Sequence, residues 1–430
     1  MKIKKIALLF LMSAAFFSVL FAEDEKRVLT VEEAVILAAD NNIDLKRNRL
    51  SLELLEKKDK FSWSGISPTA NISGNFAKPL DDDTYSWSVS AALSLNLTPS
   101  LYTTMKSAAL EYESGKISYE EAVRTVELNV RKAFYSLIYQ NESIALSRRN
   151  LETARQRYEL SRDKYNRGQL SELDLLSSQV NYENLKPSIE SAVITYENNL
   201  ALFKQMLGID QSVQIELDGS LKEALPAGNI DSGTVADELP SVKRIMRSIE
   251  AAENSLLATR FSAWGPSLTA GFSYGVSGSK MLSEPRTSSQ LSLGVIIPLD
   301  GYLPWSSGAL GIASQKASLE NLRLQLEDEK TSSVIQIENS LKGIRQAESQ
   351  LASLNNNAEL AQRSYDMTLA AYNYGSKDLL TLQNASDSLM QAKTQLQSQY
   401  YTIISAVLDL ENTLGVPFGT LGAAPENSES

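Results

Sequence analysis

Two segments of the chain alternate between apolar and small polar residues. Between Tyr85 and Leu97 every odd-numbered residue is apolar, and the even-numbered residues are mostly Ser or Asn. Residues 291–299 repeat this pattern, and a shorter alternating run precedes each segment. A period of two predicts β-strands, so we expect two β-hairpins. The hairpins are predicted at residues 67–97 and 266–299, with polar loops at 81–83 and 277–287.

Each predicted strand has one apolar and one polar face and is about ten residues long, the length of a tilted outer-membrane strand. The hairpins of a soluble β-sandwich alternate in the same way, so both interpretations stay open at this point. Lipid does not tolerate open sheet edges, and four strands cannot close a membrane barrel. If these strands span a bilayer, several chains must share one barrel.

A very long helix is predicted after each hairpin. Residues 100–166 contain no Pro and a single Gly, and residues at seven-residue intervals form one seam. The seam consists of Val123, Val130, Leu137, Ile144, Leu151, Tyr158 and Tyr165. A sustained heptad predicts a left-handed coiled coil. A second helix is expected at 307–373, and either helix would be a rod of roughly 100 Å at about 1.5 Å per residue.

Each long helix is expected to stop at a Gly and to be followed by a shorter return helix, at about 170–208 and 377–415. Pro187 in the first return helix is predicted to kink or break it. A shorter helix should also precede each hairpin. The first begins with a capping-box pair, Thr30 and Glu33, and is expected to run to about Lys60.

The order of elements is the same in both halves because the chain contains an internal duplication. Residues 154–208 align without a gap on 361–415 at an offset of 207 residues. Such similarity indicates one duplicated architecture rather than two unrelated domains. The predicted divisions are a first repeat at 23–208, a linker at 209–238, a second repeat at 239–415 and a flexible tail at 416–430.

Composition narrows the choice of function. Residues 1–22 have the basic start and apolar stretch of a secretory signal, and the stretch is short for a membrane anchor. The chain has no Cys and no His, and no nucleotide-binding or hydrolase motif, so no catalytic, metal or cofactor site is expected. A net charge of −11 disfavours nucleic acid as a partner. The negative charge is consistent with a protein that admits cations, and equally with one in which the charge serves only solubility.

The whole organisation resembles the TolC family of outer-membrane efflux proteins. The resemblance rests on the L-T-x-E-E-A start at Leu29–Ala34, the duplicated order of elements, two Y-N-x-G turns and two L-G endings. It implies an α+β membrane protein that forms a homotrimer in outer-membrane lipid. Three chains of four strands would build a 12-stranded outer-membrane β-barrel, continuous with a long periplasmic α-helical coiled-coil barrel.

The resemblance also implies a function. The trimer would be the exit duct of a tripartite efflux or type I secretion system. Its partners would be a periplasmic adaptor protein and an inner-membrane transporter of the ABC, RND or MFS type, which supplies the energy. Two other classes remain as alternatives. A structural coiled-coil envelope protein without transport activity explains the heptads but not the four strands, and only scattered carboxylates favour a secreted enzyme.

The family closes its periplasmic end with a bonded set of side chains, which the resemblance places at Asp174, Tyr372 and Lys377. Lys377 stands where the family has Arg, and a lysine lacks the bidentate fork. The family's lumen-narrowing carboxylates correspond to Thr381 and Asn384, so an acidic ring is not expected to be kept. The alternative is that Asp174 and Lys377 are solvated charges beside helix caps.

The resemblance also places adaptor docking at the two turns. The residues of these tips are Arg167, Gly168, Gln169 and Leu170 in the first copy, and Tyr374, Gly375 and Ser376 in the second.

Overall fold

The computed structural model describes residues 27–80, 85–226, 238–278 and 284–421 of the 430-residue chain. The predicted signal at 1–22 and the loop at 81–83 lie outside these residues. The chain forms two compact units. The helical unit comprises residues 1–46, 123–232 and 337–430, and the sheet unit comprises 47–122 and 233–336.

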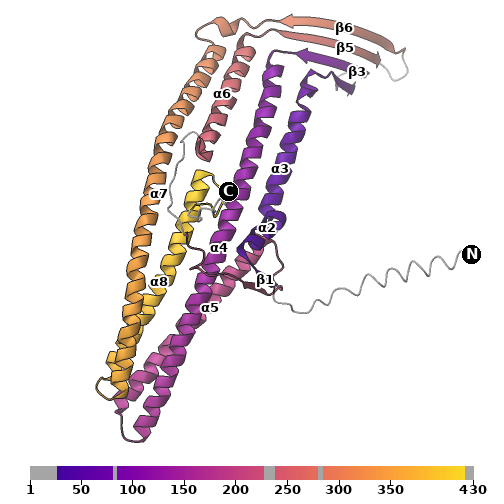
Figure 1. The fold of residues 1–430 in the computed structure, drawn as a ribbon. Helices are drawn as coiled ribbons and strands as arrows, with labels where there is room; N and C mark the ends of the chain where they lie inside the picture. The colour runs from indigo at the N-terminus through magenta and orange to yellow at the C-terminus, as the bar shows by residue number, and fades with distance from the viewer. Residues whose placement is uncertain (1–26, 81–84, 227–237, 279–283, 422–430) are drawn as a thin grey trace, which may run out of the picture. The chain divides into compact units, whose positions relative to one another are not determined.

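Most of the described chain is helical (Figure 1). The α-helices are α2 (Val31–Asn41), α3 (Ile43–Lys60), α4 (Ser100–Asn166), α5 (Glu172–Leu207), α6 (Pro240–Trp264), α7 (Ser307–Asn373) and α8 (Leu379–Leu414). The strands are β1 (Arg27–Leu29), β2 (Thr69–Ala77), β3 (Ser86–Leu97), β4 (Ile215–Leu217), β5 (Ser267–Gly278) and β6 (Arg286–Ile296). Two short 3₁₀ helices are η1 (Ser62–Ile66) and η3 (Asp300–Tyr302). No helix among the described residues has both the length and the apolar content that crossing a membrane requires.

The sheet unit contains one antiparallel sheet with the order β2-β3-β5-β6. Both predicted hairpins are present, and the pairing of β3 with β5 joins them into one sheet. The register aligns the apolar positions of all four strands; Ala70, Leu93, Phe272 and Leu291 form one such row. The apolar face is bare in this chain: Ile72 on β2 is 81% exposed. Within the described residues, the outer edges of β2 and β6 have no partner strand.

The second hairpin differs from its expected bounds at two places. β6 ends at Ile296 rather than at residue 299. Pro298 follows closely and has no N–H to donate to a sheet ladder, which accounts for the early end. β5 and β6 also reach Gly278 and Arg286, so the connection is shorter than the loop predicted at 277–287. Residues 279–283 within it lie outside the described part of the chain.

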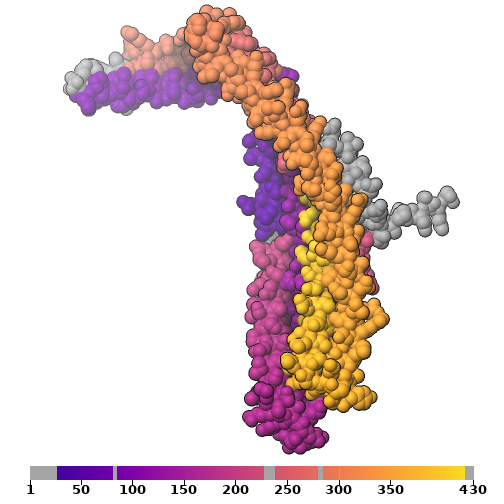
Figure 2. Space-filling model, turned by 90° about the vertical axis from the view of Figure 1, so that its left-hand side faces the viewer, coloured from indigo at the N-terminus to yellow at the C-terminus, as the bar shows by residue number. Residues whose placement is uncertain are grey.

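The helical unit consists mainly of two helical hairpins, α4 with α5 and α7 with α8. Figures 1 and 2 show α8 lying alongside α7. Large buried side chains of α4 and α5 form much of the core, including Phe134, Leu137, Phe203 and Leu207. Leu137 belongs to the predicted heptad seam, as do the buried Val130 and Ile144, so this part of the seam faces the core as a coiled-coil pattern requires.

The structure has no break at Pro187. α5 continues through it as one 36-residue helix. Proline removes one backbone donor, which leaves most helical hydrogen bonds intact. Next to it, the Ser188 hydroxyl donates to the carbonyl of Leu185 at 2.8 Å, and Ile189 is buried. The prediction of a break was therefore wrong.

The first predicted helix is divided in two at Asn42. The Asn42 side-chain amide donates to the carbonyl of Met206 at 2.9 Å. Its side-chain oxygen accepts from the backbone N–H groups of Asp44 and Leu45, so the same residue caps the start of α3. The continuous helix expected to Lys60 was therefore wrong. The capping box at the start of α2 is confirmed, with reciprocal hydrogen bonds between Thr30 and Glu33.

Two features of the helical unit have no counterpart in the sequence predictions. One is a short parallel pair of strands, β1 with β4. The other is the C-terminal segment after α8, which packs back onto α4. Its Phe418 ring lies 5.0 Å from the Arg124 guanidinium carbon and 5.8 Å from that of Arg131. The segment is thereby fixed to the core rather than frayed over the residues that are described.

Candidate gate at the helical turns

The turns α4–α5 and α7–α8 have the same backbone geometry. Gly168 and Gly375 have φ values of 70° and 76°, a left-handed conformation that favours glycine. Each is followed by a residue whose N–H reaches back across the end of the helix. Gln169 donates to the carbonyl of Lys164 at 2.8 Å, and Ser376 donates to that of Ala371 at 2.9 Å. This hydrogen-bond pattern closes a helix end and reverses the chain.

Each return helix begins with a side-chain cap, and the two copies build the cap differently. Ser171 caps α5: its hydroxyl accepts from the N–H of Asp174 at 3.1 Å and donates to the Asp174 carboxylate at 2.7 Å. Asp378 stands at the equivalent position in α8 and accepts from the N–H of Thr381 at 3.0 Å and from its hydroxyl. Thus Asp174 and Thr381, equivalent positions in the duplication, each interact with the cap of their own helix.

The hydrogen bonds at the second cap also shift the ionisation of Asp378. The Thr381 hydroxyl, and then its backbone N–H, stabilise the carboxylate and hold the pKa of Asp378 below its usual value. The neighbouring Lys377 adds a smaller effect in the same direction. At neutral pH the cap is therefore ionised and accepts both hydrogen bonds.

The three predicted lock residues have other neighbours within one chain. Tyr372 lies beneath Lys164 of α4, whose ammonium is 4.9 Å from the ring centroid. Asp174 bonds to Ser171, and Lys377 lies beside Asp378. Within the described residues of this single chain, no hydrogen bond or ion pair joins Asp174 to Tyr372 or Lys377. The lock therefore stays a prediction.

The remaining predicted site residues are largely accessible. Tyr374 is 89% exposed at the second turn. Arg167, Gly168, Gln169, Gly375 and Ser376 are also exposed, and Leu170 is half-buried. Asn384 is exposed on α8, and Thr381 is half-buried at the cap. A Cβ atom placed on either turn glycine would meet no atom within 4 Å, so both turns have open space around them.

Sequence reasoning missed two residues near the turns, Arg157 and Lys164. Both lie on α4 and contact tyrosines of α7: Arg157 donates to the hydroxyl of Tyr365 at 2.8 Å, and Lys164 covers Tyr372. A signal was present, because each cation directly precedes a tyrosine of the predicted seam in the first copy. The heptad pattern identified the seam but not the partner helix.

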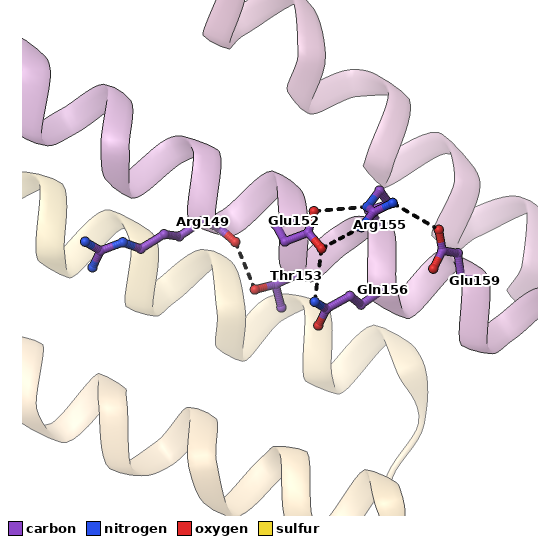
Figure 3. Close-up of polar contacts among 6 residues, drawn as sticks. All are labelled: Arg149, Glu152, Thr153, Arg155, Gln156 and Glu159. Carbon is purple, nitrogen blue, oxygen red and sulfur yellow. Dashed lines mark hydrogen bonds and ion pairs between the residues drawn. The ribbon is translucent and has the colours of Figure 1, made fainter.

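A polar cluster on the surface of α4 lies next to these contacts (Figure 3). Arg155 pairs with Glu152 at 2.8 Å and with Glu159 at 3.5 Å, and Gln156 donates to Glu152 at 3.1 Å. Hydrogen bonds from Arg155 and Gln156 lower the pKa of Glu152. All of these bonds connect residues of one helix and are exposed, so they add little to the contact between hairpins.

Comparisons with known proteins agree with this architecture. A family profile described as outer membrane efflux protein matches residues 33–208 and 237–416. The outer membrane protein TolC of Salmonella enteritidis is 22% identical over 350 residues, covering 75% of this chain and 68% of the relative. The nodulation protein T of Rhizobium leguminosarum bv. trifolii is 21% identical over 325 residues, covering 69% of this chain and 66% of the relative, slightly less than two thirds of that protein.

The fold is also that of a solved channel. The crystal structure of the Campylobacter jejuni CmeC outer membrane channel superimposes with a TM-score of 0.74 at 16% identity. The match covers 90% of this chain and 85% of that protein. The family profile matches both copies of the duplication, including both turns and all four strands of the larger sheet. The chain therefore belongs to the outer membrane efflux protein family, whose members are outer-membrane channels that extend into the periplasm.

Proposed function

We propose that the protein forms a homotrimeric channel that serves as the exit duct of a tripartite efflux or type I secretion system. Its strands would complete a shared 12-stranded barrel in the outer membrane, and its helices would continue as a coiled-coil tube in the periplasm. A periplasmic adaptor and an inner-membrane transporter would open the tube at the turns. The proposal is carried by one observation: a sheet with two free edges and one bare apolar face.

The sheet supports this proposal through both its faces and its edges. Its apolar residues project from one side and are exposed, as Leu291 and Leu293 on β6 are at 74% each. The other side carries small polar residues, including Ser73 and Ser90, whose hydroxyls lie 2.9 Å apart. An apolar outer face and a polar inner face suit a barrel wall between lipid and water. Pairing β2 of one chain with β6 of the next would remove both edges.

The helical unit supports a ring of chains in the same way. Contacts place α5 beside α4, α4 beside α8 and α8 beside α7: Asn199 bonds to Gln140, Tyr139 stacks on Tyr401, and Lys393 bonds to Gln362. Nearer the turns, α4 also contacts α7 directly. Two of these helices, α5 and α7, each present exposed residues at seven-residue spacing. These residues are Leu173, Val180, Pro187, Ile194 and Ala201 on α5, and Leu360 and Met367 on α7, followed by Tyr374 in the turn. We propose that the two stripes pack together between neighbouring chains, as heptad seams do.

The function is tested by assembly and by conductance. The purified protein is expected to migrate as a heat-modifiable trimer, to fractionate with the outer membrane, and to form discrete channels in planar lipid bilayers. A trimer that never conducts, even after opening by its adaptor, would favour the alternative of a structural envelope protein. A monomer in the soluble fraction would contradict the channel altogether.

The predicted lock is tested separately. We propose that Asp174 of the first copy bonds to Tyr372 and Lys377 of the second copy in the closed trimer. Asp174→Ala is then expected to raise single-channel conductance several-fold, because it removes the shared acceptor. Since Asp174 also bonds to the cap Ser171, Asp174→Asn is the matched variant: it keeps a side chain that can accept a hydrogen bond but lacks the charge. Unchanged conductance in both Asp174→Ala and Lys377→Ala would remove the lock.

A further inference from the structure

Two cations of α4 lie over two tyrosine rings of α7, one heptad apart. The Arg157 guanidinium is 5.5 Å from the ring centroid of Tyr365 and also donates to its hydroxyl at 2.8 Å. The Lys164 ammonium is 4.9 Å from the ring centroid of Tyr372. A cation within about 6 Å of an aromatic face is attracted by the ring quadrupole. The two contacts, Arg157–Tyr365 and Lys164–Tyr372, are called here the cation–tyrosine rungs.

The rungs exist because the duplication is unequal. At the offset of 207 residues, the counterparts of Arg157 and Lys164 are Ser364 and Ala371, which carry no charge. The second copy therefore has the tyrosines without the cations. In the first copy the equivalent Tyr158 packs within its own hairpin, stacked on Tyr182 of α5 at 6.1 Å between centroids. Consequently, both rungs take their cation from α4 and their tyrosine from α7.

The rungs join one helical hairpin to the other. α4 belongs to the first hairpin and α7 to the second. Each turn connects only the two helices of its own hairpin, so it does not link α4 to α7. A movement that separates the hairpins near the turns must break both rungs, whereas bonds within one helix, such as those of Arg155, would survive it. The rungs are therefore placed to resist such a movement.

One hydrogen-bond donor in the Arg157–Tyr365 rung has no acceptor. The Arg157 Nε is buried and has no hydrogen-bond partner within the described residues. A buried donor without a hydrogen-bond partner destabilises the structure, and exposure removes this cost because water can accept its hydrogen bond. Separation of α7 from α4 would expose this donor, which partly offsets the lost contact with Tyr365. The rung thus holds the hairpins together while remaining breakable.

We propose that the cation–tyrosine rungs hold α7 against α4 in the closed channel, and that opening breaks them. Arg157 and Lys164 are then positioning residues of the gate, in addition to the predicted lock residues. This inference rests on the proposed function. The closed state is favoured by the rungs because they form only when the hairpins are together, and their removal shifts the population towards the open state.

The first test compares single-channel recordings of purified trimers in planar bilayers. The double variant Arg157→Gln/Lys164→Gln is expected to raise the open probability on the order of tenfold, as loss of two contacts of cation–π strength allows. Lys164→Arg keeps a cation over Tyr372 and should stay near the wild type. Lys186→Gln is the matched control, because the Lys186 ammonium lies 4.2 Å from the Tyr182 centroid but both residues belong to α5. An open probability of the double variant equal to that of the wild type overturns the proposal.

The second test uses the absence of cysteine in the chain. Arg157→Cys/Tyr365→Cys removes the rung that contains no residue of the predicted lock, and it introduces two thiols per chain at the ends of that rung. With free thiols the channel should be open more often than the wild type. A short, cleavable reagent that links the thiols should close it, and cleavage should reopen it. If neither linking nor cleavage changes the conductance, the proposal is overturned. This outcome can be read even if a glutamine variant fails to assemble. Wild-type trimers that form no channels would instead contradict the proposed function.

Discussion

Replacing Arg124 with Met is expected to destabilise the folded chain by about 3 kcal/mol or more, because it removes charge-assisted hydrogen bonds to two backbone carbonyls and a positive charge close to the buried Glu411. Glu411 on α8 is 0% exposed and has Arg124 of α4 as a neighbouring positive charge. The Arg124 guanidinium also donates to the carbonyl of Glu411 at 2.7 Å and to that of Val416. Burial lowers the pKa of Arg124, while Glu127 and Glu411 favour its charged form.

The loss should extend to the C-terminal segment. The Glu411 carboxylate accepts from the N–H of Leu421 at 2.9 Å, and Phe418 packs on Arg124. Removing Arg124 is therefore expected to loosen the C-terminal segment and to leave the buried Glu411 without this nearby positive charge. Circular dichroism of the purified protein should show a lower apparent melting temperature, and limited proteolysis should cut the C-terminal segment sooner.

The control for Arg124 is a neighbouring ion pair that connects the same two helices. The Lys132 ammonium lies 2.6 Å from the Asp409 carboxylate, whose side chain is 55% exposed. Lys132→Met should cost less than about 1 kcal/mol, since exposed pairs are screened by water. Arg124→Met/Glu411→Leu should recover part of the loss, because no unpaired charge remains. Equal effects of Arg124→Met and Lys132→Met would show that the burial of Glu411 has no energetic consequence.

Gly208→Ala is expected to cost about 3 kcal/mol or more, from backbone strain and a steric clash together. Gly208 follows α5 with φ 66°, a conformation that costs other residues about 1–2 kcal/mol. A Cβ atom there would lie 2.7 Å from the Asn41 Cβ and 2.9 Å from the Asn41 carbonyl oxygen. Backbone cannot rotate away as a side-chain tip can, so α2 or the end of α5 must shift.

Gly168→Ala separates the two causes. Gly168 has a similar φ of 70°, but nothing lies within 4 Å of the added Cβ. Its cost should be the backbone term alone, about 1–2 kcal/mol. Thermal unfolding of the two variants, followed by circular dichroism in the same detergent, measures the difference. A loss at Gly208 no larger than that at Gly168 would mean that the contact with Asn41 relaxes freely.

Periodic features of this chain could be predicted from sequence because they repeat over many residues. The strict alternation after Tyr85 predicted strands, and the heptad from Val123 predicted the long helix that the structure places at Ser100–Asn166. Both patterns depend on one face of an element having a different environment from the other. The pattern states which face is apolar but does not state its partner. The pairing of β3 with β5 was therefore not predicted.

Contacts between residues far apart in sequence account for most of what was missed. Asn42 ends α2 because its side chain reaches Met206, far along the chain. Glu411 looks like an ordinary surface glutamate in sequence, but it is fully buried, and its carboxylate accepts from Leu421 of the returning C-terminal segment. At the turns, both glycines and their caps could be located, but the partner of Tyr372 in the single chain is Lys164 rather than a predicted lock residue. The lock and the docking tips stay predictions until a trimer is tested.

The two unpaired edges of the β2-β3-β5-β6 sheet have a genetic consequence in the proposed trimer. A chain with a damaged β2 edge would still present an intact β6 edge, so it could join normal chains and leave the ring open. At equal expression and random mixing, only about one trimer in eight would contain no damaged chain. Variants at either edge are therefore expected to be dominant over the normal allele, whereas variants that prevent folding of the chain are expected to be recessive.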